Sequence, residues 1–390
     1  MTSRLLIRVV LGAIGAAGIA YGIFWLYFGE PSPDFEFEYA GNQVIDLRFS
    51  PDGQKLAIVG FELPPPEPER AQVTRIVRVS DGGVIHALLG AWKCDWSANG
   101  SLFATASVNG TDFNVWETKK WGLKNHLSLL RPAGPSTDSA SADDTKVPTP
   151  GIVQRLCFDR NGSLFTVSLA QDENSKSEAN HAKIWSDPLA PSATAESIGS
   201  CGGAWDFALA GAGKNSVIAL FYKTPCSPEL LKFSLQSGKF KVEDKVALKD
   251  LPHELVGPRI ALSPDGKLLL MRDTESLDFF DLSSGSPRVV HSIKARAPIV
   301  RGSLLSFKQV EISRDGRFAV FDTEGHVNVL RLPDGKPVLT ITHYPTPLAL
   351  SPDGSLLALV DRGRHGILFY RIPGGGSGQD DAANPPTAQQ

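Results

Sequence analysis

A short turn motif recurs along this chain and limits its possible folds more than any other feature. Ser-Pro-Asp-Gly occurs at 50–53, 263–266 and 351–354, with weaker copies at 313–316 (SRDG), 97–100 (SANG) and 159–162 (DRNG). Proline presets the backbone for the first corner of a tight turn, and Asp and Gly tolerate the bends that follow. Each copy lies between mostly apolar runs, so each one predicts a β-hairpin.

The spacing of these turns predicts one large domain instead of several small ones. A chain of 390 residues would by itself suggest two or three domains. Self-similarity at a period of roughly 40 to 50 residues, however, is typical of a propeller or a solenoid. The 37 Gly, 28 Pro and 42% apolar residues fit a turn-rich all-β chain with a packed core.

The pattern of apolar runs divides the chain into seven units of up to four strands. The units begin near residues 44, 91, 152, 201, 258, 308 and 346, and the last one has only three strands. Residues 35–40 (FEFEYA) alternate apolar and acidic residues and have no hairpin partner of their own, so they supply the missing strand by pairing with 367–371 (ILFYR). The predicted fold is therefore an all-β, seven-bladed β-propeller of four-stranded antiparallel blades, spanning 35–372 and followed by a disordered tail at 373–390.

Residues 35–372 resemble the WD-repeat propellers and, more loosely, the Tol-type periplasmic propellers that share the SPDG turn. In WD-repeat proteins the third strand of a blade ends in Trp-Asp. The equivalent positions here hold Trp116-Glu117, Trp185-Ser186, Phe280-Asp281, Leu330-Arg331 and Tyr370-Arg371. The resemblance implies the propeller fold, and a fold by itself does not define a function.

The N-terminal segment has the properties of a membrane anchor. Residues 9–29 carry no charge and are mostly apolar, and as a helix they would span about 31 Å, the thickness of a bilayer's hydrocarbon core. Arg4 and Arg8 precede the segment, and acidic residues from Glu30 onward follow it, which predicts a cytoplasmic N-terminus. Residues 30–34 would then be a linker to an extracytoplasmic propeller, periplasmic in a bacterium. The alternative is a signal peptide cleaved near 18–20, which would release a secreted propeller.

The predicted export of the propeller would permit disulfides among its four cysteines. They include no Cys-x-x-Cys pair, so they indicate neither a zinc site nor a redox motif. Cys201 and Cys226 fall at the same end of the fourth unit, and we expect them to form a disulfide. Cys94 and Cys157 belong to first strands of separate blades and are expected to be buried thiols. Four free thiols remain the alternative.

The sequence contains no recognisable catalytic motif. The run GAGKN at 211–215 matches only part of a phosphate-binding loop, and the eight histidines show no metal-ligand spacing. A formal net charge of −3 gives no overall electrostatic footprint for nucleic acid. We therefore expect no cofactor, no metal and no nucleic-acid partner. An enzyme would need polar residues from several first strands to converge on the central channel, and Asp46, Asp95 and Asp206 are the candidates for such a hydrolase site.

One end of the predicted propeller is a better candidate for binding than the other. The connections from first to second and from third to fourth strand are mostly short, whereas the other connections include the long insertions. Loops on a rigid scaffold commonly carry function. The predicted binding residues on this long-loop face are Lys294, Arg296, Arg301, His343, Arg362, Arg364 and His365. The sequence thus predicts a monomeric, non-enzymatic scaffold that binds a protein or peptide, most simply an acidic segment.

Overall fold

The computed structural model describes the chain from residue 31 to residue 376 with gaps. The described ranges are 31–39, 43–62, 71–107, 112–128, 152–158, 164–171, 180–186, 195–201, 203–209, 216–223, 227–236, 239–247, 259–272, 276–284, 287–294, 309–323, 325–342, 347–361 and 366–376. Between 152 and 247 the description is largely limited to the backbone of the strands. All regular elements in these ranges are β-strands.

The strands form seven four-stranded antiparallel sheets, which we number as blades 1 to 7 in chain order. Blade 1 contains β2 (Gln43–Phe49), β3 (Lys55–Glu62), β4 (Ala71–Arg78) and β5 (Val84–Leu89). Blade 2 contains β6 (Lys93–Trp96), β7 (Leu102–Ala106), β8 (Asp112–Glu117) and β9 (Gly122–Ser128). Blade 3 contains β10 (Ile152–Phe158), β11 (Leu164–Gln171), β12 (Asn180–Ser186) and β13 (Ala195–Cys201).

The remaining blades follow the same order. Blade 4 contains β14 (Gly203–Leu209), β15 (Ser216–Lys223), β16 (Ser227–Gln236) and β17 (Lys239–Ala247). Blade 5 contains β18 (Arg259–Leu262), β19 (Leu268–Arg272), β20 (Ser276–Asp281) and β21 (Arg288–Lys294). Blade 6 contains β22 (Val310–Ile312), β23 (Phe318–Thr323), β24 (His326–Arg331) and β25 (Lys336–Thr342). Blade 7 contains β26 (Leu348–Leu350), β27 (Leu356–Asp361), β28 (Gly366–Arg371) and β1 (Phe35–Glu38).

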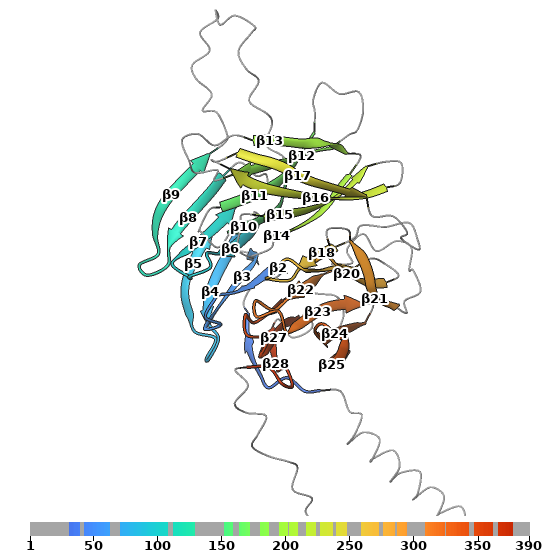
Figure 1. Ribbon diagram of the computed structural model, residues 1–390. Helices are drawn as coiled ribbons and strands as arrows, with labels where there is room; N and C mark the ends of the chain where they lie inside the picture. Colours follow the sequence, from blue (N-terminus) through green and yellow to red (C-terminus); the bar gives the residue numbers. More distant parts are fainter. Residues whose placement is uncertain are drawn as a thin grey trace, which may run out of the picture.

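The blades are arranged in a closed ring around a central channel. The first strands of consecutive blades contact one another, from β2 through β6, β10, β14, β18 and β22 to β26, and β26 contacts β2 again. Figure 1 shows these first strands towards the middle, with fourth strands such as β9, β13, β21 and β25 at the periphery. The predicted division into four-stranded antiparallel sheets is confirmed.

The hydrophobic core lies between the faces of neighbouring blades. One cluster joins blades 7 and 1 through residues such as Leu47, Ile58 and Phe369, and others join blades 1 and 2, 2 and 3, 5 and 6, and 6 and 7. Because a sheet must bury its apolar faces against other sheets, each blade depends on both of its neighbours. Stability therefore depends on keeping the ring closed.

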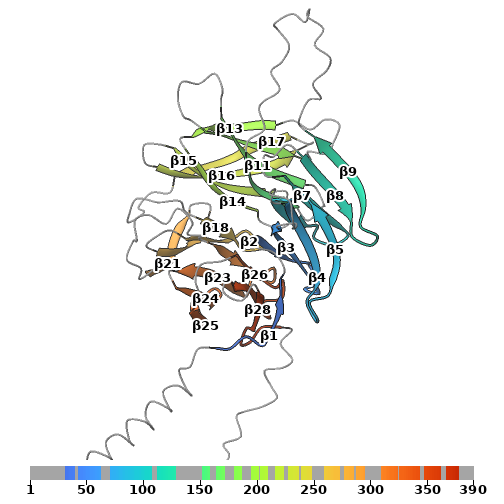
Figure 2. The ribbon, with the colours of Figure 1, turned by 180° about the vertical axis from the view of Figure 1, so that it is seen from behind.

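The two termini close the ring, as the sequence predicts. β1 pairs with β28 in the register Phe35↔Phe369 to Glu38↔Gly366, and Figure 2 shows the two strands side by side. The rings of Phe35 and Phe369 stack with centroids 4.5 Å apart. The strand covers Phe35–Glu38, so it is shorter than the predicted 35–40.

The five described Ser-x-Asp/Asn-Gly turns all lie at one end of the ring, which we call the short-turn face. It carries the connections from first to second and from third to fourth strands, and the opposite end is the long-loop face. Asp34 lies at the short-turn face, because its N–H donates to the Phe369 carbonyl oxygen at 2.8 Å beside the end of β28. The folded chain therefore enters the ring from the short-turn face.

The folded part extends beyond the predicted boundary at residue 372. The amide of Gly375 donates to the carbonyl oxygen of Ile372 at 2.9 Å, and Gly374 and Gly376 adopt positive φ angles of 73° and 89°. Glycine adopts such angles without steric cost, so this glycine run forms a folded turn at its start and not a flexible linker.

Residues 377–390 and the predicted span at 9–29 lie outside the described ranges. Within those ranges, no helix is long and apolar enough to cross a bilayer.

Candidate functional site

Charged side chains of blades 1 and 6 meet at the channel, beside a backbone amide of blade 7. Arg48 of β2 donates from Nη1 to Oε1 of Glu311 on β22, and its Nη2 lies 3.5 Å from Oδ1 of Asp46. The other oxygen of Glu311 accepts a hydrogen bond from the Leu350 amide of β26 at 3.2 Å. A single carboxylate therefore links blade 6 to both blade 1 and blade 7.

Other polar side chains of first strands cap the free edge of the next blade. Oδ2 of Asp95 on β6 accepts from the Phe158 amide of β10 at 2.9 Å, and Oε1 of Gln309 accepts from the Leu348 amide at 2.8 Å. An innermost strand leaves backbone N–H groups without a strand partner, and buried N–H groups need an acceptor. Burial raises the pKa of Asp95, against the opposing effect of the Phe158 N–H. Asp95 therefore joins blades 2 and 3.

Among the channel carboxylates that the structure describes, Asp46 is the best candidate for a functional residue. It is 2% exposed, and its Oδ1 accepts from the Leu47 amide at 3.1 Å. Its Oδ2 has no hydrogen-bond partner in the part of the chain that the structure describes. Burial alone would lower the pKa of Arg48, but the carboxylates of Asp46 and Glu311 outweigh it and raise that pKa, so the guanidinium stays charged. Asp206 is described only as backbone within β14.

Cys94 lies beside this cluster as a buried free thiol, as predicted. It is 1% exposed, and burial raises its pKa well above the ordinary value. Thiolates are the reactive form of cysteine, so burial keeps this thiol unreactive. Across the described ranges, no three His, Cys, Asp or Glu side chains lie close enough together to hold a metal ion.

The short-turn end of the channel is spanned by one side chain. Arg314 occupies the position that proline holds in the three SPDG turns, and its Nη1 donates to the carbonyl oxygen of Ala98 at 3.0 Å. The two residues belong to the turns of blades 6 and 2, on different sides of the ring. A ligand reaching the Arg48–Glu311 pair from the long-loop end would not have to pass this contact.

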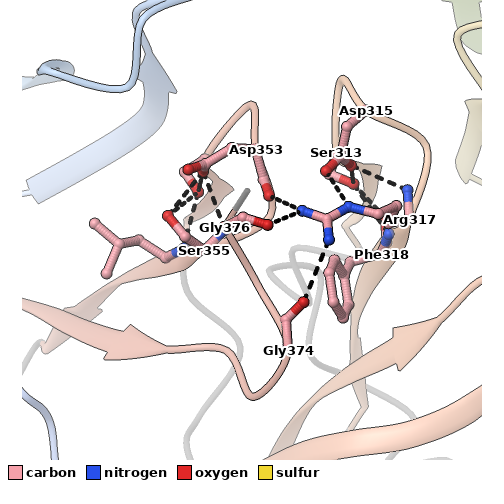
Figure 3. Close-up of polar contacts among 10 residues, drawn as sticks. Ser313, Asp315, Arg317, Phe318, Asp353, Ser355, Gly374 and Gly376 are labelled. Carbon is pink, nitrogen blue, oxygen red and sulfur yellow. Dashed lines mark hydrogen bonds and ion pairs between the residues drawn. The ribbon is translucent and has the colours of Figure 1, made fainter. Parts of the chain in front are cut away.

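A second arginine fixes the C-terminal end of the folded chain (Figure 3). Nε of Arg317 donates to Oδ2 of Asp315 at 2.6 Å. Its Nη2 donates to the carbonyl oxygens of Asp353 at 3.0 Å and Gly376 at 2.6 Å. Arginine presents its five donors in a rigid planar fork, so one side chain can hold several carbonyl groups. Arg317 thereby ties blade 6 to the turn of blade 7 and to the segment that follows β28.

Most of the predicted binding residues lie outside the described ranges. Lys294 ends β21 at the long-loop face, and its side chain is exposed. Arg296, Arg301, His343, Arg362, Arg364 and His365 fall in connections that the structure does not describe. Cys201 ends β13 at the same face, and Cys226 is outside the described ranges, so the disulfide remains a prediction.

Two solved structures are similar to this chain along most of its length. The β-propeller domain of Myceliophteria thermophila Cps50 (Swd1) matches with a TM-score of 0.58 and 12% identity, covering 87% of this chain and 99% of that one. The fold is a β-propeller. Kuenenia stuttgartiensis hydrazine synthase also matches this propeller, with a TM-score of 0.56 and 11% identity over 87% of this chain and 98% of the other.

These similarities concern the fold alone, because identities this low carry no information about function. No known protein family matches the sequence of the propeller. No curated protein sequence matches it significantly either.

Arg48, Glu311 and Gln309 were not predicted from the sequence as channel residues. Position could have found two of them, because Arg48 and Glu311 each lie two residues before the serine of a turn motif, as Asp95 does. That position faces the neighbouring blade at the channel. Aligning the blades on the serine would therefore have placed these three charges at one level.

Proposed function

We propose that the protein is a membrane-anchored, extracytoplasmic scaffold that binds a protein or peptide on the long-loop face of its propeller. The observation that carries this proposal is the asymmetry of the connections. The longest ones, 129–151, 248–258 and 295–309, all leave the long-loop face, whereas the longest connection at the opposite face is 187–194. The five described turns between first and second strands, at the opposite face, are short and hydrogen-bonded within themselves. Variable loops on a rigid ring are a common way to build a binding surface.

The route of the chain supports the orientation of this scaffold. Asp34 and Arg371 lie together at the short-turn face, where the Arg371 amide donates to Oδ2 of Asp34 at 2.6 Å. An anchor formed by residues 9–29 would therefore join the propeller at that face. The long-loop face would then point away from the membrane, towards partners in the extracytoplasmic space.

The positive charge expected on the long-loop face indicates which kind of partner it would bind. We expect five cations to lie together at one side of the long-loop face: Lys294, Arg296, Arg301, Arg362 and Arg364. Charges of one sign favour encounter with the opposite sign, with an affinity that falls as salt rises. The expected partner is an acidic segment of another protein.

Charge reversal on the two faces tests this proposal. We expect the variant Arg296→Glu, Arg301→Glu, Arg362→Glu and Arg364→Glu to lose the partners that full-length protein captures by crosslinking in its native membranes. Lys119→Glu, Lys120→Glu, Arg288→Glu and Lys336→Glu make the same change in charge at exposed sites near the short-turn face and should leave capture intact. Equal capture by both variants would place the binding site elsewhere, and full-length protein found only in the soluble fraction would contradict the anchor.

A further inference from the structure

A cleft of about 530 Å³ opens between blades 5 and 6 at the short-turn face. Its apolar part comes from Pro264, Leu268, Val290, Leu332 and Pro333. Clefts of several hundred cubic ångströms with an apolar floor and a few placed polar groups are typical of ligand sites. This cleft is distinct from the Arg48–Glu311 cluster and from the long-loop face, and it shares Asp315 with the Arg317 contacts described above.

The charges that line the cleft are mostly acidic. Asp265, Asp281 and Asp315 line it together with one cation, Lys267. Asp315 is paired with Arg317, whose remaining donors are used on the segment after β28. Among the described residues, Asp265 and Asp281 are therefore the lining carboxylates outside an ion pair, and Lys267 and Arg288 are the cations that act on them.

Both of these carboxylates keep one oxygen available. Oδ1 of Asp265 accepts from the Ser263 hydroxyl at 2.6 Å and from the Lys267 amide at 3.1 Å. Oδ1 of Asp281 likewise accepts from the amide and hydroxyl of Ser283, at 2.8 and 2.6 Å. These bonds lower the pKa of both aspartates, so both are ionised at neutral pH while their Oδ2 atoms make none of these turn bonds.

The outer wall of the cleft is an exposed strand. β21 is the outermost strand of blade 5, so one edge of its backbone has no neighbouring strand in the sheet. Val289 and Val290 on this strand are 42% and 51% exposed, and Val290 lines the cleft. An extended peptide can add to such an edge while its side chains enter a neighbouring pocket.

We propose that this cleft binds an extended segment of a partner protein in which Lys or Arg stands next to apolar residues. The apolar side chains pack on Pro264, Leu268 and Val290, and the basic side chain meets Asp265 and Asp281. The proposal does not depend on the long-loop site, because the two surfaces lie on opposite faces of the ring. A failure of one is therefore distinguishable from a failure of the other.

The test is a selection from a displayed library of random linear peptides on purified full-length protein. We expect the enriched peptides to combine Arg or Lys with apolar residues and to bind more weakly at high salt. Binding of the best synthetic peptide should weaken about tenfold in the Asp265→Asn, Asp281→Asn variant, because charge-assisted bonds are lost. Asparagine should preserve the turn, since Asn99 makes the same bonds to Ser97 and Ser101 in blade 2.

The control is Asp52→Asn, Asp353→Asn, which removes two carboxylates from the turn position of Asp265 in blades 1 and 7, outside the cleft. This control should bind the peptide as the wild type does. Hydrogen exchange on the wild-type complex gives a second readout, with new protection expected in β21. The proposal is overturned if no peptide is enriched, if both double variants bind the peptide equally, or if protection appears only elsewhere.

Discussion

At the scale of single residues, the serine that begins each turn motif holds the turn by hydrogen bonds, which the proline that follows it in three copies does not. Its hydroxyl in blade 5, on Ser263, accepts from the Leu268 amide at 2.9 Å and donates to Asp265. The same pair of bonds forms at four other turns, and all five serines are buried, with exposures of 1 to 6%. Proline instead packs against the turn of the adjacent blade. A Cβ atom added to Gly100 of blade 2 would lie 3.6 Å from Cδ of Pro51 of blade 1, so the two turns are in contact.

Replacing a turn serine should therefore destabilise the ring. We expect Ser263→Ala to lower the free energy of unfolding by about 1 to 3 kcal/mol, because the partly buried Leu268 amide loses its acceptor. Ser283→Ala is the matched control, since its hydroxyl also bonds an aspartate but is exposed, and its effect should stay within about 0.5 kcal/mol. Urea denaturation followed by tryptophan fluorescence measures both. Equal effects would mean that burial of the serine is not what matters.

At the scale of elements, β1 is the strand on which the closed ring depends. It is only four residues long, but Phe35 and Phe37 both lie against Phe369, with ring centroids 4.5 and 5.1 Å away. Phe369 is fully buried between blades 7 and 1. Closing a ring with a strand from the other terminus also removes an exposed sheet edge.

Loss of β1 should consequently weaken the whole ring and not blade 7 alone. We expect deletion of residues 30–40, or Phe35→Ser with Phe37→Ser, to lower the free energy of unfolding by about 2 to 5 kcal/mol. The control is Glu36→Ser with Glu38→Ser, which changes exposed positions of the same strand and should cost less than about 1 kcal/mol. Calorimetry of the purified proteins measures the shift. An unchanged melting temperature after the deletion would contradict the closure role of β1.

At the scale of the whole molecule, the repeated turns give the ring a shared dependence on pH. The Ser263 hydroxyl lowers the pKa of Asp265. In Asp52 and Asp353 burial is the largest effect and works in the opposite direction, but the bonds from Ser50 and the Gln54 amide, and from Ser351 and Ser355, together outweigh it and lower the pKa there too. A carboxylate with a lowered pKa in the folded state stabilises the fold above its unfolded pKa, and this contribution is lost as the pH falls through the folded pKa. Burial raises the pKa of Asp95, so this carboxyl contributes to the pH dependence of stability with the opposite sign.

Stability should therefore fall as the pH drops below about 4, the ordinary range of Asp. A variant with Asp52→Asn, Asp265→Asn and Asp353→Asn should be less stable than the wild type at neutral pH and should lose less stability on acidification. Urea denaturation at a series of pH values measures this slope. Parallel curves for variant and wild type would show that these three carboxylates do not govern acid stability.

The sequence by itself determined the repeat, the positions of the turns and the closing partnership of β1 with β28. Each of these follows from local chemistry: a Ser-x-Asp-Gly turn needs only its own five or six residues, and an alternating strand needs only its own apolar period. The tertiary structure decided which polar residues act together. Arg48 meets Glu311 across 263 positions of sequence, and Arg314 meets Ala98 across 216. It also decided that Asp95 caps the next blade and that Arg317 holds the segment after β28. These contacts depend on how far apart the blades stand around the channel, a distance set by interblade packing and absent from any local pattern.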